Sequence, residues 1–291
     1  MILVFLPLIW SGTVNAEDTV LANTDKKEVN CGSPPRLDFK MVSYITTNYK
    51  SQAEYRCGLG ETFLSTCGID GKWSKPNGTC KRPTTCKEFK KCGEIVTDGE
   101  YWIYPTGLHG KKLKVYCSGM QTEHPKEYIS LMRENFSFYP AKKPWFFCVT
   151  RSNLEWQHPG KTLFKKIRIN PENLKVNRTD FQFAELVPKS GKARWSYGVA
   201  ADCLFEKGSS CKSQGEMRID LTGTGLAVDR RVSWTNFGTN SRIAEFKRLK
   251  NGQVVTARCG GHCGGCKPLC IKLIAAKTGF VENPARECEE L

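Results

Sequence analysis

The residues with the most chemical capacity in this chain lie close together near its C-terminal end. One imidazole and four thiols fall within residues 259–270: Cys259, His262, Cys263, Cys266 and Cys270. Two close thiol pairs beside an imidazole have the density of a zinc-ligand set. A zinc site usually separates its pairs by a longer loop, however, and an oxidising compartment favours two or more disulfides at this spacing. We therefore expect disulfides here rather than a metal, with their pairing left open.

Catalytic signatures are absent from the sequence. Metalloprotease chemistry needs two imidazoles one helical turn apart and a carboxylate base, in the pattern His-Glu-x-x-His. The histidines are instead far apart, at His109, His124, His158 and His262. Pro125 follows His124 and disfavours a helix through that position. No local signature of a serine or cysteine mechanism is present either. We expect no catalytic residue, no metal and no cofactor.

The start of the chain indicates the redox compartment. Ile2–Trp10 is an apolar stretch, and residues 14–16 (Val-Asn-Ala) offer the small side chains that signal peptidase prefers. The stretch is too short for a membrane span of roughly 20 residues, and Pro7 interrupts it. We predict a signal peptide at 1–16, secretion to the extracellular space and no membrane span. Fifteen cysteines behind such a leader are expected to form disulfides.

The charge balance points to anionic partners. The chain has 44 Lys and Arg against 29 Asp and Glu, a net charge of +15. Charge of this size attracts polyanions over long range. For a secreted protein these are sulfated glycosaminoglycan or acidic protein faces, so we expect no nucleic acid partner. The basic residues are dispersed in short groups, at 87–91, 111–114, 142–143, 165–168 and 247–250. We therefore expect diffuse electrostatic binding without a shaped site.

Three tripeptides are acceptor sequons for N-linked glycans. They begin at Asn77, Asn135 and Asn177, and none has proline in the middle. A glycan cannot be buried, so each sequon that is used must lie on the surface. The sequence therefore predicts a glycoprotein with exposed asparagines at these positions.

A compact cysteine-rich segment occupies residues 31–80, after a polar tail at 17–30 without periodicity. Gly and Pro punctuate it, and it holds four cysteines: Cys31, Cys57, Cys67 and Cys80. About 50 residues cannot build a self-sufficient core, so two disulfides are expected. Short strands are predicted at Tyr49–Arg56 and Thr62–Cys67.

Two motifs in this segment carry a family resemblance, Tyr55-Arg56-Cys57 and Gly71-Lys72-Trp73. With the four cysteines they resemble a sushi module, also called a complement control protein module. The resemblance implies that Trp73 packs between two disulfides, Cys31–Cys67 and Cys57–Cys80. Such modules are binding spacers without chemistry of their own.

The larger remainder, residues 86–276, follows a linker at 81–85. Its sequence pattern predicts mostly β-strands. Alternating or β-branched stretches occur at 101–104, 113–116, 163–169, 217–221, 226–228, 243–249 and 254–257. Gly223-Thr224-Gly225 predicts a turn that leads from 217–221 back through 226–228. Asn251-Gly252 predicts a type I′ hairpin turn. The fold class is therefore mainly β, with a small disulfide-stapled module followed by a larger, irregular, β-rich and cysteine-rich domain.

A series of motifs recurs in order along this remainder: Thr85–Glu88, Asp98–Tyr101, Val115–Met120, Pro125–Ile129, Phe164–Ile169, Ala201–Cys203, Leu221–Leu226 and Cys259–Cys266. Together they resemble a GON domain, over about Cys86 to Ile274. GON domains end the longest members of a group of secreted, disintegrin-like zinc metalloproteinases with thrombospondin repeats. The resemblance implies an extracellular module separate from the catalytic domain of those enzymes.

Two disulfides are predicted in this domain. The opening around Asp98–Tyr101 and Val115–Cys117 also resembles the start of fibrinogen-type recognition domains, and that likeness implies the pair Cys86–Cys117. Cys203 and Cys211 are close enough in sequence to close a small loop.

An odd number of cysteines leaves at least one thiol without a partner in the chain. Cys288 is our candidate, because it lies in the polar tail at 277–291, where the chain should be mobile. Cys92 and Cys148 are the alternatives, since both lie where the family pattern is broken. A free Cys288 would allow a disulfide-linked dimer.

The sequence thus predicts a secreted, non-catalytic interaction or adhesion protein. Its partners are expected among extracellular proteins, the matrix and sulfated glycosaminoglycan. The alternative is a zinc-binding protein related to metalloendopeptidases, or a protease subunit, because the family relatives are zinc enzymes. In that case too, the catalytic His-Glu-x-x-His domain is missing from this sequence.

Overall fold

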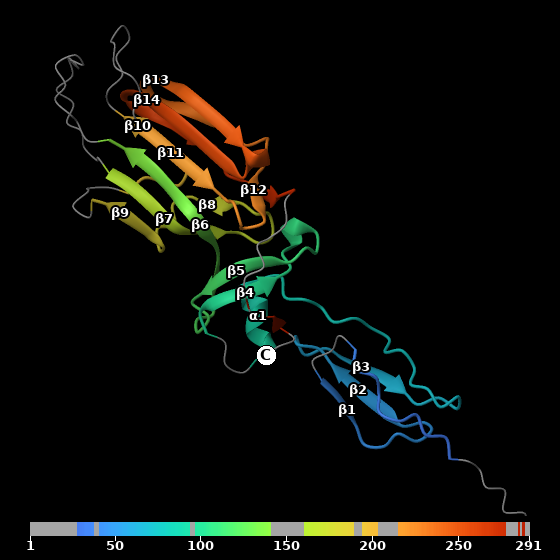
Figure 1. Cartoon of the computed structure of the whole chain (residues 1–291). Coiled ribbons are helices and arrows are strands. Elements are labelled where there is room, and N and C mark those ends of the chain that lie inside the picture. The colour runs from blue at the N-terminus through green and yellow to red at the C-terminus, as the bar shows by residue number, and fades with distance from the viewer. Residues whose placement is uncertain are drawn as a thin grey trace, which may run out of the picture.

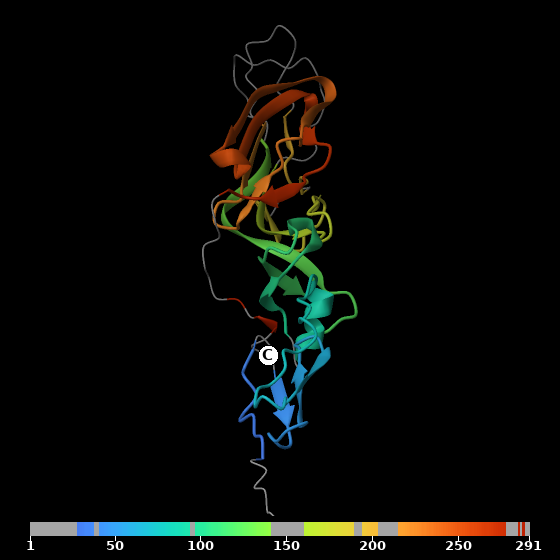
Figure 2. The same cartoon turned by 90° about the vertical axis from the view of Figure 1, so that its right-hand side faces the viewer.

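A computed structural model of the chain describes residues 28–37, 41–93, 97–140, 160–188, 194–202, 215–277, 285, 287 and 288, without the side chains of residues 262 and 263. Two β-rich parts follow one another along a single long axis (Figures 1 and 2). The described α-helix is a short one, α1 (Cys86–Phe89), beside fifteen strands. The mainly β fold predicted from the sequence is therefore confirmed. The predicted signal peptide lies outside the described residues.

The small N-terminal module is a three-stranded antiparallel sheet. Its order is β1 (Met41–Tyr44), β2 (Gln52–Arg56) and β3 (Thr62–Thr66). Two disulfides hold it, with Cα atoms 5.8 and 5.4 Å apart, in the pairing that the sushi resemblance implies: Cys31–Cys67 and Cys57–Cys80. Short strands and two staples thus replace a large core.

The two aromatic residues of the sushi motifs differ in burial but make similar hydrogen bonds. Tyr55 is buried on β2, and its hydroxyl donates to the carbonyl oxygen of Pro35 at 2.9 Å. Trp73 is half-buried opposite Cys67 in an isolated β-bridge, and its Nε1 donates to the carbonyl oxygen of Gly32 at 2.8 Å. Both side chains therefore tie loops to the sheet through their polar ends.

The described part of the larger domain is built on a ten-stranded antiparallel sheet. Its central order is β10-β14-β11-β6-β5-β4, with β13 paired to β14 and with β7 carrying β8 and β9 beside β6. The strands are β4 (Gly99–Ile103), β5 (Leu113–Ser118), β6 (Lys126–Tyr139), β7 (Gly160–Ile169), β8 (Val176–Asn177), β9 (Ala184–Val187), β10 (Ala200–Asp202), β11 (Gly215–Asp220), β13 (Trp234–Leu249) and β14 (Val254–Pro268). A separate two-stranded sheet pairs β12 (Leu226–Val228) with β15 (Leu273–Ala275).

The pattern of buried and exposed side chains along the strands shows where the core of the larger domain lies. On β5 and β11 buried and partly exposed side chains alternate over the first four residues, and the last two residues of each strand are both buried. The largest fully buried side chains of the domain come from α1, from β4, β5, β6, β7 and β11, and from turns between strands: Phe89, Tyr101, Ile103, Leu113, Met120, Tyr128, Ile129, Ile167, Leu174, Tyr197 and Met217. One continuous apolar cluster thus joins the sheets.

Both predicted turns are present, and the Asn251-Gly252 turn differs from the type predicted for it. β13 and β14 form the predicted hairpin, with Leu249 opposite Val254. The connection is η3 (Lys250–Gly252) followed by Gln253, so it is longer than a two-residue type I′ turn. The glycine turn after β11 is also present, but β12 does not return to pair with β11, because its partner is β15.

The segment predicted as a linker, 81–85, makes contacts with Tyr104 and with the start of α1. The Tyr104 backbone N–H donates to the carbonyl oxygen of Pro83 at 2.8 Å, and the Arg82 guanidinium lies 4.7 Å from the Tyr104 ring centre. Thr85 caps α1 by accepting from the backbone N–H of Glu88, whose carboxylate in turn accepts from Thr84. The motif Thr85–Glu88 therefore works as a helix start signal of the capping-box kind.

Cys288 is bonded to Cys92, so the prediction that it is the unpaired thiol was wrong. Their Cα atoms are 5.1 Å apart although 196 positions separate them in the sequence. Cys288 is only 3% exposed, and the carboxylate of its neighbour Glu287 lies 3.4 Å from Lys112 Nζ. The polar composition of the tail gave no sign of this anchoring.

Of the described cysteines, Cys270 is free, and it is exposed. The predicted pair Cys86–Cys117 is present, with Cα atoms 5.6 Å apart. Cys148, Cys203 and Cys211 lie outside the described residues.

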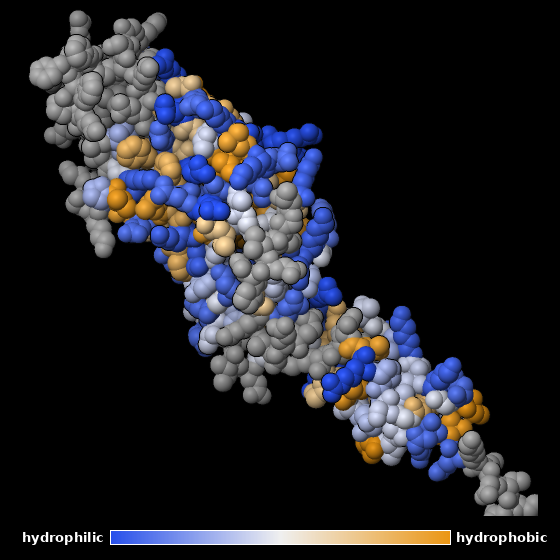
Figure 3. Space-filling model, viewed as in Figure 1, coloured by the Kyte–Doolittle hydropathy of each residue, from blue (hydrophilic) through white to orange (hydrophobic). Residues whose placement is uncertain are grey.

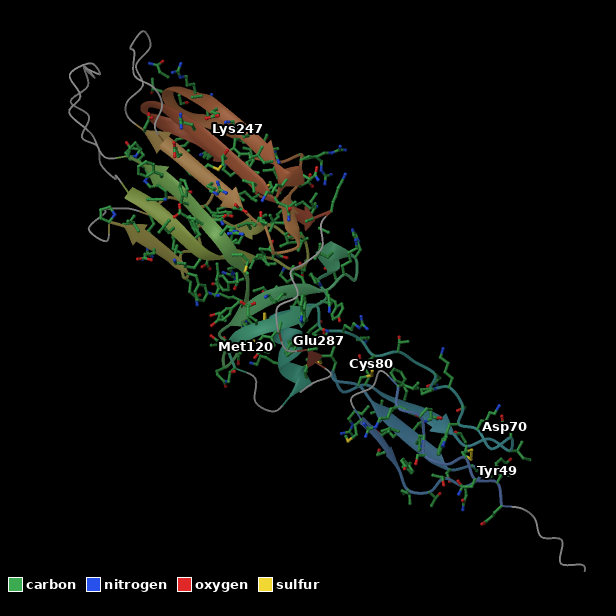
Figure 4. The ribbon with its side chains drawn as sticks, viewed as in Figure 1. Tyr49, Asp70, Cys80, Met120, Lys247 and Glu287 are labelled. Atoms are coloured by element: carbon green, nitrogen blue, oxygen red, sulfur yellow. A yellow bond between two sulfur atoms is a disulfide. The ribbon has the colours of Figure 1, made fainter. Side chains whose placement is uncertain are left out.

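The two parts of the molecule meet at the Cys92–Cys288 disulfide. A Cβ placed on Gly58 of the small module would lie 2.6 Å from Cys288 Sγ, so the backbone there rests directly on the disulfide. Leu59 packs against the core cluster of the larger domain, which includes both cysteines. Figure 4 places Glu287 beside α1 at this junction. The C-terminal segment is therefore part of the contact between the two modules.

Candidate functional site

The cysteine-rich strand β14 is a folded ribbon and not an open ligand cluster. Cys259 and Cys266 are joined by a disulfide, with Cα atoms 5.7 Å apart. Seven residues of extended strand would separate them by roughly 23 Å. The strand must therefore bend back on itself between these residues, and β13 follows the bend with register shifts between 237 and 245. The disulfide fixes the fold of this ribbon.

Glycine is required where the ribbon bends. A Cβ on Gly260 would lie 2.1 Å from the Asp202 carboxylate, and one on Gly265 would lie 2.0 Å from the carbonyl oxygen of Ala200. Similar clashes of 2.4–2.6 Å with backbone atoms of β13 or its neighbours would occur at Gly261 and Gly264. Contacts below 3.0 Å are essentially unknown for real Cβ atoms. The paired glycines of the motif Cys259–Cys266 thus permit close backbone packing.

The buried carboxylate of Asp202 fills the space that the glycines leave. It is 0% exposed, and its oxygens accept from the backbone N–H groups of Gly261 at 3.0 Å and Gly215 at 3.3 Å. A carboxylate held in this way is fixed by backbone donors on two strands. The motif Ala201–Cys203 therefore supplies an anchor that joins β10, β11 and β14.

Two of the four cysteines considered as zinc ligands in this region, Cys259 and Cys266, are not available to bind a metal. Zinc binds thiolates, and Cys259 and Cys266 are engaged in a disulfide. Within the described residues, no group of three His, Cys, Asp or Glu side chains is placed to hold a metal ion. The side chains of His262 and Cys263 lie outside the described residues.

Asn135, predicted as a glycan acceptor, is buried instead, so this prediction was wrong. It is 0% exposed, and its Nδ2 donates to the carbonyl oxygens of Asp220 at 2.9 Å and Arg133 at 3.0 Å. Its Oδ1 accepts from the Tyr197 hydroxyl and from the Asp220 backbone N–H, both at 2.7 Å. The amide thus bridges β6 and β11 where β6 bulges after Ser130. No room remains for a sugar.

The other two sequons lie on the surface. Asn77 and Asn177 are both exposed. The Asn177 Oδ1 accepts from the backbone N–H and the hydroxyl of Thr179, at 3.2 and 3.1 Å, which holds the tripeptide in a turn. Both positions meet the steric requirement for a glycan.

A first prediction concerns the buried side-chain amide of Asn135. Asn135→Ala leaves the partners on Asp220 and Tyr197 unsatisfied, so the free energy of unfolding should fall by about 2–4 kcal/mol. Asn77→Gln, at an exposed position, should leave it within about 0.5 kcal/mol. Chemical denaturation of both variants, after enzymatic removal of glycans, measures the difference. Equal unfolding free energies for Asn135→Ala and the unchanged protein would contradict the buried network.

Four basic side chains line a hollow of 710 Å3 beside β12 and η3. Its lining residues come from three separate segments of the chain: Val228, Asp229, Arg230, Arg231, Arg248, Asn251, Gly252, Ile274 and Lys277. We call it the basic hollow. Figure 3 shows hydrophilic surface along this edge of the larger domain. It was not predicted from the sequence, because its basic residues come from separate short groups along the chain. The pair Arg230-Arg231 was the available signal.

The one carboxylate of the basic hollow is already engaged. Asp229 forms a forked ion pair with Arg231, with Nη2 2.6 Å from Oδ2 and Nε 3.1 Å from Oδ1. Hydrogen bonds from Arg231, with help from the nearby charge of Lys272, lower the pKa of Asp229 from 3.8 to about 2. Among the described residues, Asp229 thus forms its ion pair with Arg231, and its charge also acts on the nearby Arg248.

Arg248 is fixed in place by neutral partners. Its guanidinium donates to the carbonyl oxygens of Asp229 and Val232 and lies 5.6 and 5.5 Å from the rings of Trp234 and Phe246. Burial lowers the pKa of Arg248 from 12.5, but an arginine stays charged at neutral pH. The position of the guanidinium is therefore fixed within the fold.

A second hollow, of 470 Å3, lies on the face formed by β6, β11, β13 and β14 and differs in charge. Three arginines and three glutamates line it: Arg133, Arg218, Arg258, Glu134, Glu216 and Glu245. Arg258 and Glu216 form an ion pair at 3.0 Å, and Glu134 pairs with Lys161 at 2.7 Å. Its charges balance, so it offers no comparable attraction for an anion.

Two family models match this chain and together define the class of protein. A family model described as Sushi repeat (SCR repeat) matches residues 31–80, and one described as GON domain matches residues 83–275. Both are disulfide-rich β modules, as the structure shows. Because the GON match covers more than half of the chain, this protein belongs to the GON domain family, with a sushi repeat before the GON domain.

The relatives are very large proteins of which this chain matches a small part. It is 32% identical over 205 residues to A disintegrin and metalloproteinase with thrombospondin motifs 20 of Mus musculus, covering 65% of this chain and 10% of that protein. A disintegrin and metalloproteinase with thrombospondin motifs gon-1 of Caenorhabditis elegans is 32% identical over 203 residues, covering 64% of this chain and 9% of its own length. The similarity covers only their C-terminal GON region, which is non-catalytic. No solved structure matches this chain.

The described helices give no indication of a membrane span. None of them has both the length and the apolar content that crossing a bilayer requires.

A second prediction concerns the ion pair between Asp229 and Arg231 and the pKa of the Asp229 carboxyl group. Its pKa is lower in the folded chain than the ordinary value of 3.8, so the pair stabilises the fold above about pH 4. That stabilisation is lost as the pH falls through about 2. Arg231→Gln removes the main cause of the lowered pKa and should unfold at a lower temperature than the unchanged protein at pH 6.

The gap between the two melting temperatures should then close as the pH falls towards 2. Thermal unfolding followed by circular dichroism at several pH values measures it. A gap that stays constant from pH 6 to pH 2 would show that Asp229 does not depend on Arg231.

Proposed function

We propose that this chain is a secreted, non-catalytic interaction protein that binds partners in the extracellular matrix or at cell surfaces, including polyanionic ones. Secretion is supported by the predicted signal peptide at 1–16 and by five disulfides among the described residues, which persist in an oxidising compartment. Glycans at Asn77 and Asn177 are part of the proposal, since both side chains are exposed.

The observation that carries the proposal is the contact between the two modules. Gly58 and Leu59 of the sushi repeat rest on the disulfide Cys92–Cys288 of the GON domain. The residues between the modules are themselves held by backbone and ring contacts. A chain built in this way presents two binding modules at a set spacing, so less entropy is lost when both engage a partner. That property suits an adhesion or bridging protein.

Two surface features support the two kinds of partner. The net charge of +15 attracts anionic chains over long range. The sushi repeat exposes large apolar side chains, among them Ile45 at 99%, Ile69 at 74% and Leu64 at 51% exposure, and these offer apolar contact area to a protein partner. Figure 3 shows apolar surface on this module. Polyanions and extracellular proteins are therefore both proposed as partners.

The alternative of a zinc-binding, protease-related protein has less support. It rests on the word metalloproteinase in the names of relatives, of which this chain covers about a tenth. Two thiols of the candidate ligand set form a disulfide. Bound zinc together with cleavage of a matrix protein by the purified chain would reverse this order of preference.

Polyanion binding makes a third prediction. The purified chain should be retained on immobilised heparin at 0.1 M NaCl and released as the salt concentration rises. The reason is that the Debye length shrinks from about 10 Å at 0.1 M to about 3 Å at 1 M salt. A salt gradient on the heparin column, with unsulfated agarose as the control, measures it. Passage without retention at 0.1 M, or retention that persists at 1 M, would contradict electrostatic binding.

A further inference from the structure

We propose that the basic hollow beside β12 and η3 is a binding site for a sulfated oligosaccharide. This rests on the proposed binding of polyanions and names the place and the ligand class. The hollow brings together residues 228–231, 248–252 and 274–277, which are far apart in the sequence. The diffuse binding expected from the dispersed basic residues is thereby replaced by a focused site.

Charge is the first argument. Four basic side chains line the hollow, Arg230, Arg231, Arg248 and Lys277, against the single carboxylate of Asp229. Asp229 is engaged by Arg231. Among the described residues no carboxylate lies within ion-pair distance of Arg230, Arg248 or Lys277, and Arg230 and Lys277 are exposed. Three positive charges without an ion-pair partner among the described residues therefore face one recess, which concentrates the field on an incoming anion.

Preorganisation is the second argument. The Arg248 guanidinium is held by two carbonyl oxygens and flanked by the rings of Trp234 and Phe246. A guanidinium has five N–H donors, so donors remain for an oxyanion after these two contacts. Because the group is already fixed, little side-chain entropy is lost on binding. Planar, weakly hydrated guanidinium is also the cation best suited to tetrahedral oxyanions.

Shape and lining favour a sugar over the other anionic ligands. The hollow has a volume of 710 Å3, within the range of about 300–1,000 Å3 usual for small-ligand sites. Val228 and Ile274 add apolar surface between the charges, against which the C–H face of a sugar ring can pack. A flat bilayer of anionic lipid cannot enter a recess. Sulfate groups on a stiff sugar chain can reach separate cations around its rim.

The test compares two charge-matched variants of the full chain. Arg230→Ala with Lys277→Ala removes two positive charges from the hollow. Lys87→Ala with Lys165→Ala removes two from exposed positions on α1 and β7, outside the hollow. Titration calorimetry with a heparin-derived octasaccharide at 0.1 M NaCl should show a Kd roughly tenfold weaker for the first variant, since each exposed charge pair contributes up to about a factor of five. The second variant should change by less than about twofold.

Arg248→Gln provides a further check on the fixed guanidinium. It should also weaken octasaccharide binding roughly tenfold, and thermal unfolding of the same sample shows whether the variant remains folded. The same octasaccharide without its sulfates should not bind the unchanged protein.

The remaining outcomes separate this proposal from the one on which it rests. Equal weakening by the two double variants would mean that polyanions bind diffusely, which keeps the proposed function and overturns the site. Binding to phosphatidylserine vesicles but not to the octasaccharide would overturn the ligand class. An unchanged protein that binds no polyanion at all would overturn the proposed polyanion binding together with the site.

Discussion

The close approach of three strands to β14 is the constraint on which the rest of the larger domain depends. β10, β11 and β13 all pair with this strand, and it bends back on itself where Cys259 and Cys266 are joined. The bend leaves no space for a Cβ at Gly260 or Gly265, and the carboxylate of Asp202 occupies part of that space. Side chains there would push β10 off the sheet and leave a buried charge without its backbone donors.

A second constraint acts at the other end of the domain and explains how the modules stay together. The Cys92–Cys288 disulfide connects the start of the GON domain with the end of the described chain. Because Gly58 rests on this disulfide, closing the GON domain also shapes the surface that receives the sushi repeat. The small module therefore depends on its two disulfides in place of a large core, whereas the larger domain combines a continuous apolar core with disulfides that fix its ends.

Local patterns in the sequence predicted what depends on neighbouring residues. Tyr55, Trp73 and the spacing of four cysteines marked the sushi repeat, and Asn251-Gly252 marked a real hairpin. Patterns failed where distant residues decide: nothing in a polar tail indicates that Cys288 meets Cys92, and a sequon does not reveal that Asn135 bridges two strands. The basic hollow was missed for the same reason, since its charges converge only after three segments fold together.

The free energy of unfolding of Gly260→Ala, measured by guanidinium denaturation beside Gly99→Ala, tests the central constraint most directly. At Gly99, on β4, a new Cβ would come no closer than 3.6 Å to a neighbour, whereas at Gly260 it would lie 2.1 Å from Asp202. The packing of β14 predicts a loss of at least about 2 kcal/mol for Gly260→Ala and less than about 1 kcal/mol for Gly99→Ala. Equal values for the two variants would contradict the folded ribbon.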